Sequence, residues 1–164
     1  EGLIREVRAL RTRASPEALF RSFASLGGER GWLVWNWAWA LRGFLDRLLG
    51  GPGLRRGRHH PTELLPGEAV DFWRVEAVEP PRLLRLRAEM RLPGRAWLEW
   101  EAREAEGGSL LVQTAYFEPK GLTGFLYWWA LYPIHRRIFS DLARAIVREA
   151  EAQAEAPPRG GGAG

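Results

Sequence analysis

Four strand-like runs in the middle of the chain are separated by very short connectors, and this spacing limits the fold more than any other feature. The runs are 69–78, 82–92, 95–104 and 109–118, and the connectors contain Pro80-Pro81, Pro93-Gly94 and Gly107-Gly108. Parallel neighbours need a crossover of about a dozen residues or more, whereas antiparallel neighbours need only a tight turn. The middle of the chain is therefore predicted to be an antiparallel meander.

One of these runs shows which kind of sheet to expect. Leu84, Leu86, Ala88 and Met90 alternate with Arg85, Arg87, Glu89 and Arg91. A clean period of two predicts a sheet with one dry face and one wet face. A helix has to cover the dry face, and the region after Gly121 carries apolar residues at helical spacing: Leu131, Ile134, Ile138, Leu142, Ala145 and Ile146.

The N-terminal part is predicted to hold a strand over 3–12 and then two helices. Ser15-Pro16-Glu17 is a helix start, with an N-cap, a proline in the first turn and an acidic residue, and it would turn Leu19, Phe20 and Phe23 inward. A second, Trp-rich helix is predicted over 35–49. The Pro- and Gly-rich segment 157–164 is predicted to be a disordered tail.

These elements predict one α+β domain over 1–156, in which a curved antiparallel sheet wraps around a long C-terminal helix. A hydrophobic content of 46% and nine Trp suffice for a single core. The chain has no Cys and three His, so we predict no disulfide, no thiol nucleophile and no metal site. The longest charge-free apolar stretch, 121–134, is too short to span a bilayer, and a cytoplasmic location is expected.

Charge and motifs limit the function further. The 24 basic residues, all but one of them Arg, are interspersed with 20 acidic ones, a bias expected of a bacterial GC-rich genome and of a thermophile rather than of a nucleic-acid-binding stripe. No Gly-x-Ser-x-Gly elbow and no phosphate-binding Gly-rich loop occur. Without a Gly-x-Gly-x-x-Gly fingerprint, we expect no cofactor in this portion.

Several multi-residue blocks resemble the bacterial family called domain of unknown function 2867. They include Gly27-Gly28 with Gly31-Trp32, Leu41-Arg42-Gly43 with Asp46, Arg55-Arg56-Gly57-Arg58, Asp71-Phe72-Trp73-Arg74-Val75, Gln113-Thr114-Ala115, and Tyr127-Trp128 with Pro133 and His135. The resemblance implies the START/polyketide-cyclase-like (SRPBCC) helix-grip fold. It also implies an NAD(P)-binding, short-chain-reductase-like domain before Glu1, so that this chain would be the C-terminal portion of a longer protein.

Two polar residues are the weak candidates for catalysis. Asp71 shares a predicted strand face with Trp73 and Val75, where burial would raise the pKa of its carboxyl group. Pairing with Arg42 or Arg55 is the alternative. His135 lies at helical spacing from Leu131, Ile138 and Leu142 and would act as a base or a hydrogen-bond donor, unless it is an ordinary core histidine.

The remaining candidates would bind a ligand. Trp32, Trp35 and Trp39 would line an apolar pocket or lie at a membrane surface, although plain core packing explains them better than either. Arg55 and Arg58, in the densest basic cluster, suit a phosphate or an acidic partner, or simply solvent. The other candidates lie on the predicted helices, the sheet or the loop after it: Asp46, Trp73, Met90, Trp97, Glu99, Gln113 and Trp128.

Three functions follow from these features. The first is a domain whose apolar cavity binds a small hydrophobic, lipid- or polyketide-like molecule, as an accessory to the reductase-like domain. The second is a cyclase, dehydratase or hydrolase that uses Asp71 and His135. The third is a ligand-free interaction domain that docks through the Trp-rich helix and the basic loop.

Overall fold

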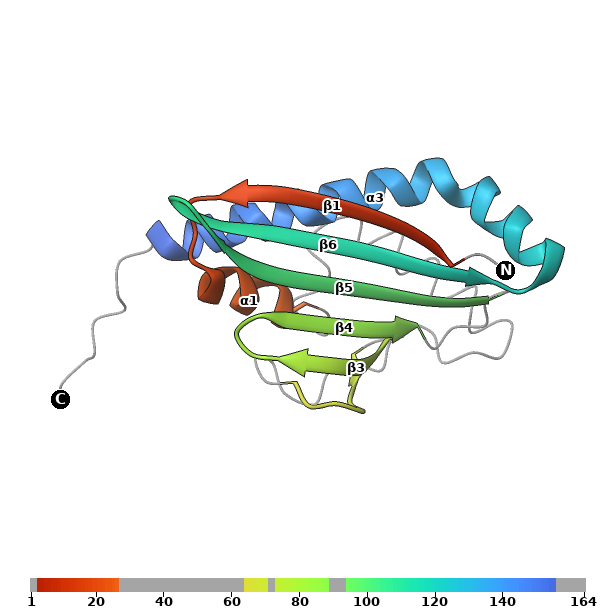
Figure 1. Cartoon of the computed structure of the whole chain (residues 1–164), viewed down its shortest axis with the longest axis horizontal. Coiled ribbons are helices and arrows are strands. Elements are labelled where there is room, and N and C mark those ends of the chain that lie inside the picture. Colours follow the sequence, from red (N-terminus) through yellow and green to blue (C-terminus); the bar gives the residue numbers. More distant parts are fainter. Residues whose placement is uncertain (1–2, 27–63, 71–72, 89–93, 156–164) are drawn as a thin grey trace.

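A computed structural model describes residues 3–26, 64–70, 73–88 and 94–155 of the chain. These residues form a six-stranded sheet and two helices (Figure 1). The elements are β1 (Ile4–Thr12), α1 (Pro16–Ala24), β2 (Ala69–Val70), β3 (Trp73–Glu79), β4 (Leu83–Ala88), β5 (Gly94–Ala105), β6 (Gly108–Pro119) and α3 (Gly121–Glu155). The second helix predicted over 35–49 and the tail predicted over 157–164 lie outside the described residues.

The sheet has the order β1-β6-β5-β4-β3-β2, and all its neighbours are antiparallel. The strands from β3 to β6 form the predicted meander. β1 pairs with β6 along its whole length, from Ile4 opposite Phe117 to Thr12 opposite Ser109. The first strand therefore lies beside the last strand, at the edge of the sheet.

The sequence pattern predicted a single strand over residues 69–78, and this prediction was wrong. Ala69 pairs with Arg74, and Val70 pairs with Trp73, so the chain reverses direction between β2 and β3. Such a reversal shifts the alternation by one residue, and the two residues of β2 are too few to show that shift in the sequence.

Both helices cover the same face of the sheet, which we call the inner face (Figure 1). α1 begins as predicted, because the Ser15 side chain accepts a hydrogen bond from the Ala18 amide at 3.1 Å and Pro16 opens the first turn. Leu19 and Phe23 are fully buried. α3 runs along β1 and β6, and its C-terminal part also packs on α1.

The two halves of α3 are packed differently. In the C-terminal half, residues 138–155, Leu142, Ile146 and Ala150 are fully buried in the core. In the N-terminal half, residues 121–137, the outward side is apolar yet exposed: Leu122, Phe125, Leu126, Trp129 and Ile134. Ile134 was predicted to lie in the inward stripe, but it lies at the edge of that stripe and is 54% exposed.

Candidate functional site

The inner face of the sheet changes in character along the strands. Beneath the C-terminal half of α3 it carries the large side chains of Leu84, Trp100 and Leu111, all of which are buried. Towards the other end it carries three small side chains, those of Ala88, Ala96 and Ala115, whose partners in register are the larger Trp73, Phe117 and Leu98. Large side chains therefore fill one end of the inner face, whereas alanines alternate with large side chains at the other.

Aromatic rings of α3 lie over the alanine end. Trp128 stacks on Phe117 of β6, with ring centroids 5.3 Å apart and an angle of 13° between the planes. Trp73 of β3, opposite Ala88 in register, is buried in the same core. Trp73 and Trp128 thus lie on the inner side of the domain, where a ligand-binding role would require them.

His135 lies within this aromatic group. Its ring is 6.4 Å from Tyr127, 6.0 Å from Trp128 and 5.7 Å from Phe139, measured between centroids. The side chain is half-buried on the sheet side of α3. These neighbours are rings of the same helix, and Trp128 among them stacks on Phe117 of the sheet.

Gln113 joins the sheet to α3. Its side-chain oxygen accepts a hydrogen bond from the Trp100 indole at 2.8 Å, and its amide nitrogen donates to the Phe139 carbonyl at 2.9 Å. The side chain is 2% exposed. Each end of the amide has a hydrogen-bond partner in the protein, so Gln113 orients Trp100 and α3.

A charged pair on β1 also faces inward, and the sequence analysis did not identify it. Glu6 lies opposite Ala115 and Arg8 lies opposite Gln113 in the register of β1 and β6. Arg8 donates from Nη2 to Glu6 Oε1 at 2.7 Å and to the Arg136 carbonyl of α3 at 3.4 Å. Within the described part of the chain, Glu6 Oε2 and Arg8 Nε are buried and have no hydrogen-bond partner.

Apolar residues occur on both faces of β1, so hydropathy does not indicate that Glu6 and Arg8 face inward. Val7 and Ala9 are the apolar residues between the charges, and a strand usually turns such residues inward. Val7 is instead 50% exposed, while Glu6 and Arg8 share the inner face with Leu10. Leu10 and Thr12 lie at the same period as Glu6 and Arg8, and this spacing could have indicated that the pair faces inward. The charges of Glu6 and Arg8 argue more strongly for an exposed position.

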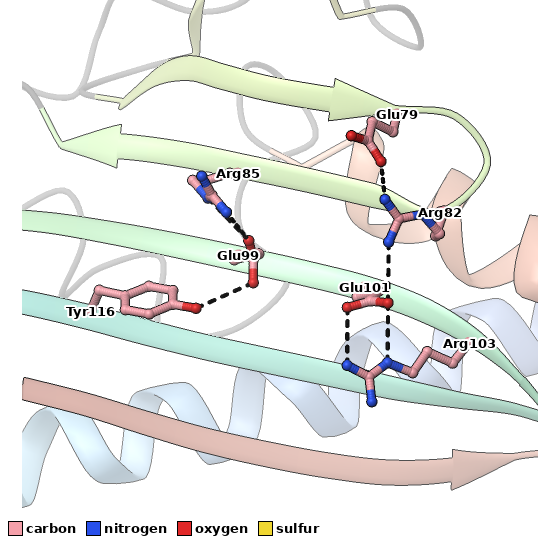
Figure 2. A network of polar contacts seen from close by, with 7 residues as sticks. All are labelled: Glu79, Arg82, Arg85, Glu99, Glu101, Arg103 and Tyr116. Atoms are coloured by element: carbon pink, nitrogen blue, oxygen red, sulfur yellow. Dashed lines mark hydrogen bonds and ion pairs between the residues drawn. The ribbon is translucent and has the colours of Figure 1, made fainter.

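Two of the predicted site residues, Trp97 and Glu99, lie on the opposite, outer face of the sheet, where Figure 2 shows a network of charged side chains. Glu99 accepts hydrogen bonds from Arg85 at 2.6 Å and from the Tyr116 hydroxyl at 3.4 Å. On this face Trp97 and Glu99 are separated by the sheet from the side chains beneath α3. They therefore do not belong to the same site as Trp73, Trp128 and His135.

The second part of this network surrounds Glu101. Arg103 donates to both carboxylate oxygens, at 3.0 and 3.2 Å, and Arg82 donates at 3.3 Å while also pairing with Glu79 (Figure 2). Hydrogen bonding from Arg103, with the charges of Arg103 and Arg82, holds the pKa of Glu101 below its ordinary value of 4.5. This arrangement is that of a solvated, ion-paired sheet surface.

The other predicted site residues lie outside the described ranges: Trp32, Trp35, Trp39, Asp46, Arg55, Arg58, Asp71 and Met90. The meeting of Asp71 with His135 therefore stays a prediction. Among the described side chains, no group of three His, Asp or Glu is arranged to hold a metal ion. None of the helices in the described ranges has both the length and the apolar character needed to cross a membrane.

Comparisons with known proteins agree with the predicted family and fold. The sequence matches the family described as "Protein of unknown function (DUF2867)" over residues 3–142. A search of curated proteins found no match.

Solved structures share the architecture at low sequence identity. The Zhui aromatase/cyclase from Streptomyces sp. R1128 has a TM-score of 0.59 and 17% identity, with 94% of this chain and 98% of that chain covered. Ara h 8.0201 has a TM-score of 0.54 and 14% identity, covering 92% and 99%. SA2116 from Staphylococcus aureus, also of unknown function, has a TM-score of 0.57 and 12% identity, covering 94% and 98%. The chain has the helix-grip fold that the sequence predicted.

Proposed function

Because the chain belongs to the DUF2867 family of proteins of unknown function, whose name states no activity, we propose its function from the inner face: it binds a small apolar molecule there. The ligand lies between the N-terminal half of α3 and the alanine end of the sheet. The observation that carries this proposal is the contrast between the two ends of the inner face.

Packing supports this location. Protein cores are close-packed, and a sheet position that bears only a methyl group leaves room that another group has to fill. Ala88, Ala96 and Ala115 occupy such positions on three adjacent strands. The aromatic side chains above them, Tyr127 and His135, are half-buried rather than fully buried. An apolar molecule of a few rings or a short acyl chain would complete this packing.

The fold supports the same ligand class. Ligand sites in proteins are mostly apolar and concave, with few polar groups that orient the ligand. One structural relative is described as an aromatase/cyclase. The lining of Trp73, Trp128 and Phe117 suits a flat or extended apolar molecule, of the lipid- or polyketide-like kind.

The family resemblance supports a second part of the proposal, an accessory role beside an NAD(P)-binding, reductase-like domain. In this role the domain holds the apolar molecule, and the partner domain supplies the dinucleotide. We assign no dinucleotide to this chain, because its sequence has no Gly-x-Gly-x-x-Gly fingerprint.

Native mass spectrometry of the purified protein tests both parts. We expect an added mass of a small molecule carried from the host, absent from the denatured spectrum. Titration with the neutral fluorophore N-phenyl-1-naphthylamine should then show saturable binding, and Ala96→Leu, which fills the proposed site, should weaken it by about tenfold or more.

Ala9→Leu is the matched control, because Ala9 is exposed on the outer face of β1 and its replacement should leave binding unchanged. A bare native mass together with no saturable fluorescence would contradict the ligand-binding function and would favour a ligand-free interaction domain. A dinucleotide in the native spectrum would contradict the accessory role.

A further inference from the structure

The buried ion pair on β1 points to a more specific ligand. We propose that Glu6 and Arg8 bind a neutral hydroxyl group of the apolar ligand, as one donor and one acceptor held side by side. This inference rests on the proposed function, since it places the polar end of the ligand at the border of the apolar site described above.

The position of the pair supports this role. Glu6 lies opposite Ala115, one of the small inner-face residues, and Arg8 lies opposite Gln113. The contact of Arg8 with the Arg136 carbonyl brings the pair beneath α3, next to the helical turn that carries His135. Glu6 and Arg8 are 15% and 25% exposed, so the pair is largely withdrawn from water yet not sealed.

The hydrogen bonding of the pair is incomplete. A guanidinium and a carboxylate can form two parallel hydrogen bonds, but here only Nη2 donates, to Oε1. Among the described residues, Arg8 Nε and Glu6 Oε2 have no partner although both atoms are buried. A buried unsatisfied group costs free energy, and a charged one costs more than a neutral one. A ligand that satisfies both atoms would therefore gain affinity.

The chemistry of these two atoms selects the ligand group. Arg8 Nε–H can only donate, and ionised Glu6 Oε2 can only accept. A hydroxyl accepts from the first and donates to the second. An ether or ketone accepts only, so it leaves Glu6 unsatisfied. A carboxylate is repelled by Glu6, and an ammonium is repelled by Arg8. An alcohol or phenol on an apolar body fits best.

A similar ion pair on the outer face of the sheet provides a comparison. Glu101 and Arg103 are also two residues apart on one strand and form an ion pair at 3.0 Å. Their charges face away from the alanine end, and the network around them satisfies both carboxylate oxygens. The two pairs have the same spacing and composition, but only the pair on β1 adjoins the proposed site.

Isothermal titration calorimetry with a matched series of naphthalenes tests the inference. The probes are 2-methylnaphthalene, 2-methoxynaphthalene, 2-naphthol and 2-naphthoate, which share one apolar body. In the natural sequence 2-naphthol should bind about tenfold more tightly than 2-methylnaphthalene. The affinity of 2-methoxynaphthalene should lie between these two, and 2-naphthoate should bind most weakly of the four.

The double variant Glu6→Leu/Arg8→Leu removes both charges, so neither is left unpaired in the interior. It should still bind 2-methylnaphthalene, while the preference for 2-naphthol disappears. The control Glu101→Leu/Arg103→Leu should keep the preference. Circular dichroism checks that both variants fold. If Glu6→Leu/Arg8→Leu does not fold, the ranking of the probes in the natural sequence decides the test.

The outcomes separate the two proposals. If no probe binds the natural sequence, the apolar site itself is contradicted. If 2-methylnaphthalene binds and 2-naphthol has no advantage, the apolar site stands and the hydroxyl assignment is overturned. A preference for 2-naphthol that persists in the folded Glu6→Leu/Arg8→Leu variant would also overturn the assignment to this pair.

Discussion

At the scale of single residues, buried polar side chains connect the sheet to the helix above it. Gln113 has one end on Trp100 and the other on the Phe139 carbonyl, so a single side chain holds a core indole and α3 in position. Such bridges contribute to stability mainly because their loss leaves buried partners without a hydrogen bond. The same reasoning makes Glu6 and Arg8, whose partners are incomplete, better candidates for ligand binding than Gln113.

Replacing Gln113 by Leu should destabilise the protein by about 2 kcal/mol, because the Trp100 N–H and the Phe139 carbonyl would both lose a buried partner. Urea unfolding followed by Trp fluorescence measures this difference. Gln153→Leu serves as the control, since Gln153 is exposed on α3 and its side chain donates a hydrogen bond to Glu149 in the same helix. Equal stabilities of the two variants would show that the Gln113 bridge has no net effect.

At the scale of elements, the β5–β6 hairpin determines where β1 can lie. Glu106 and Gly107 form its turn, and Gly108 begins β6 opposite Ala105. The two glycines meet different surroundings. A Cβ atom at Gly108 would collide with the Thr12 carbonyl and lie 2.8 Å from Arg13 Cα. A Cβ at Gly107, where φ is +77°, meets no atom of the described chain within 4 Å. The close approach at Gly108 lets the end of β1 pack against the turn.

Gly108→Ala should therefore cost about 2 kcal/mol or more, because backbone atoms on β1 would have to move. Gly107→Asn is the matched variant, and it should change stability by less than about 0.5 kcal/mol, since Asn tolerates a positive φ in a turn. Thermal unfolding of both variants measures the difference. If Gly108→Ala were as stable as Gly107→Asn, the close contact with β1 would not be required.

At the scale of the whole molecule, α3 does two different things. Its C-terminal half closes the core between the sheet and α1, with Leu142 and Ile146 fully buried. Its N-terminal half lies over the alanine end and leaves an apolar outer side exposed. Stability is therefore concentrated at one end of the domain, and the proposed binding region lies at the other end.

This division predicts unequal effects along one helix. Leu142→Ala should destabilise the domain by about 2 to 5 kcal/mol, because it opens a cavity in a filled core. Leu126→Ala, at a position that is 60% exposed, should change stability by less than about 0.5 kcal/mol. Urea unfolding of the two variants is the measurement. A large loss for Leu126→Ala would mean that the outer side of α3 is covered in the folded protein.

Much of the fold could be predicted from local patterns. The short connectors required antiparallel neighbours, the alternation around Leu84 and Leu86 assigned the buried face of β4, and Ser15-Pro16 marked the start of α1. The long C-terminal helix followed from its apolar spacing. These features depend on backbone geometry and burial within a few residues, which a sequence records directly.

Other features depended on contacts between distant parts of the chain. The antiparallel pairing of β2 with β3, the placement of β1 beside β6, and the inward direction of Glu6 and Arg8 depend on register, and a shift of one residue would reverse every side chain of a strand. The same register separates Glu99 from Gln113, because it assigns them to opposite faces. Sequence alone thus determined most of the described elements and the family, while tertiary pairing decided which polar side chains lie beneath α3.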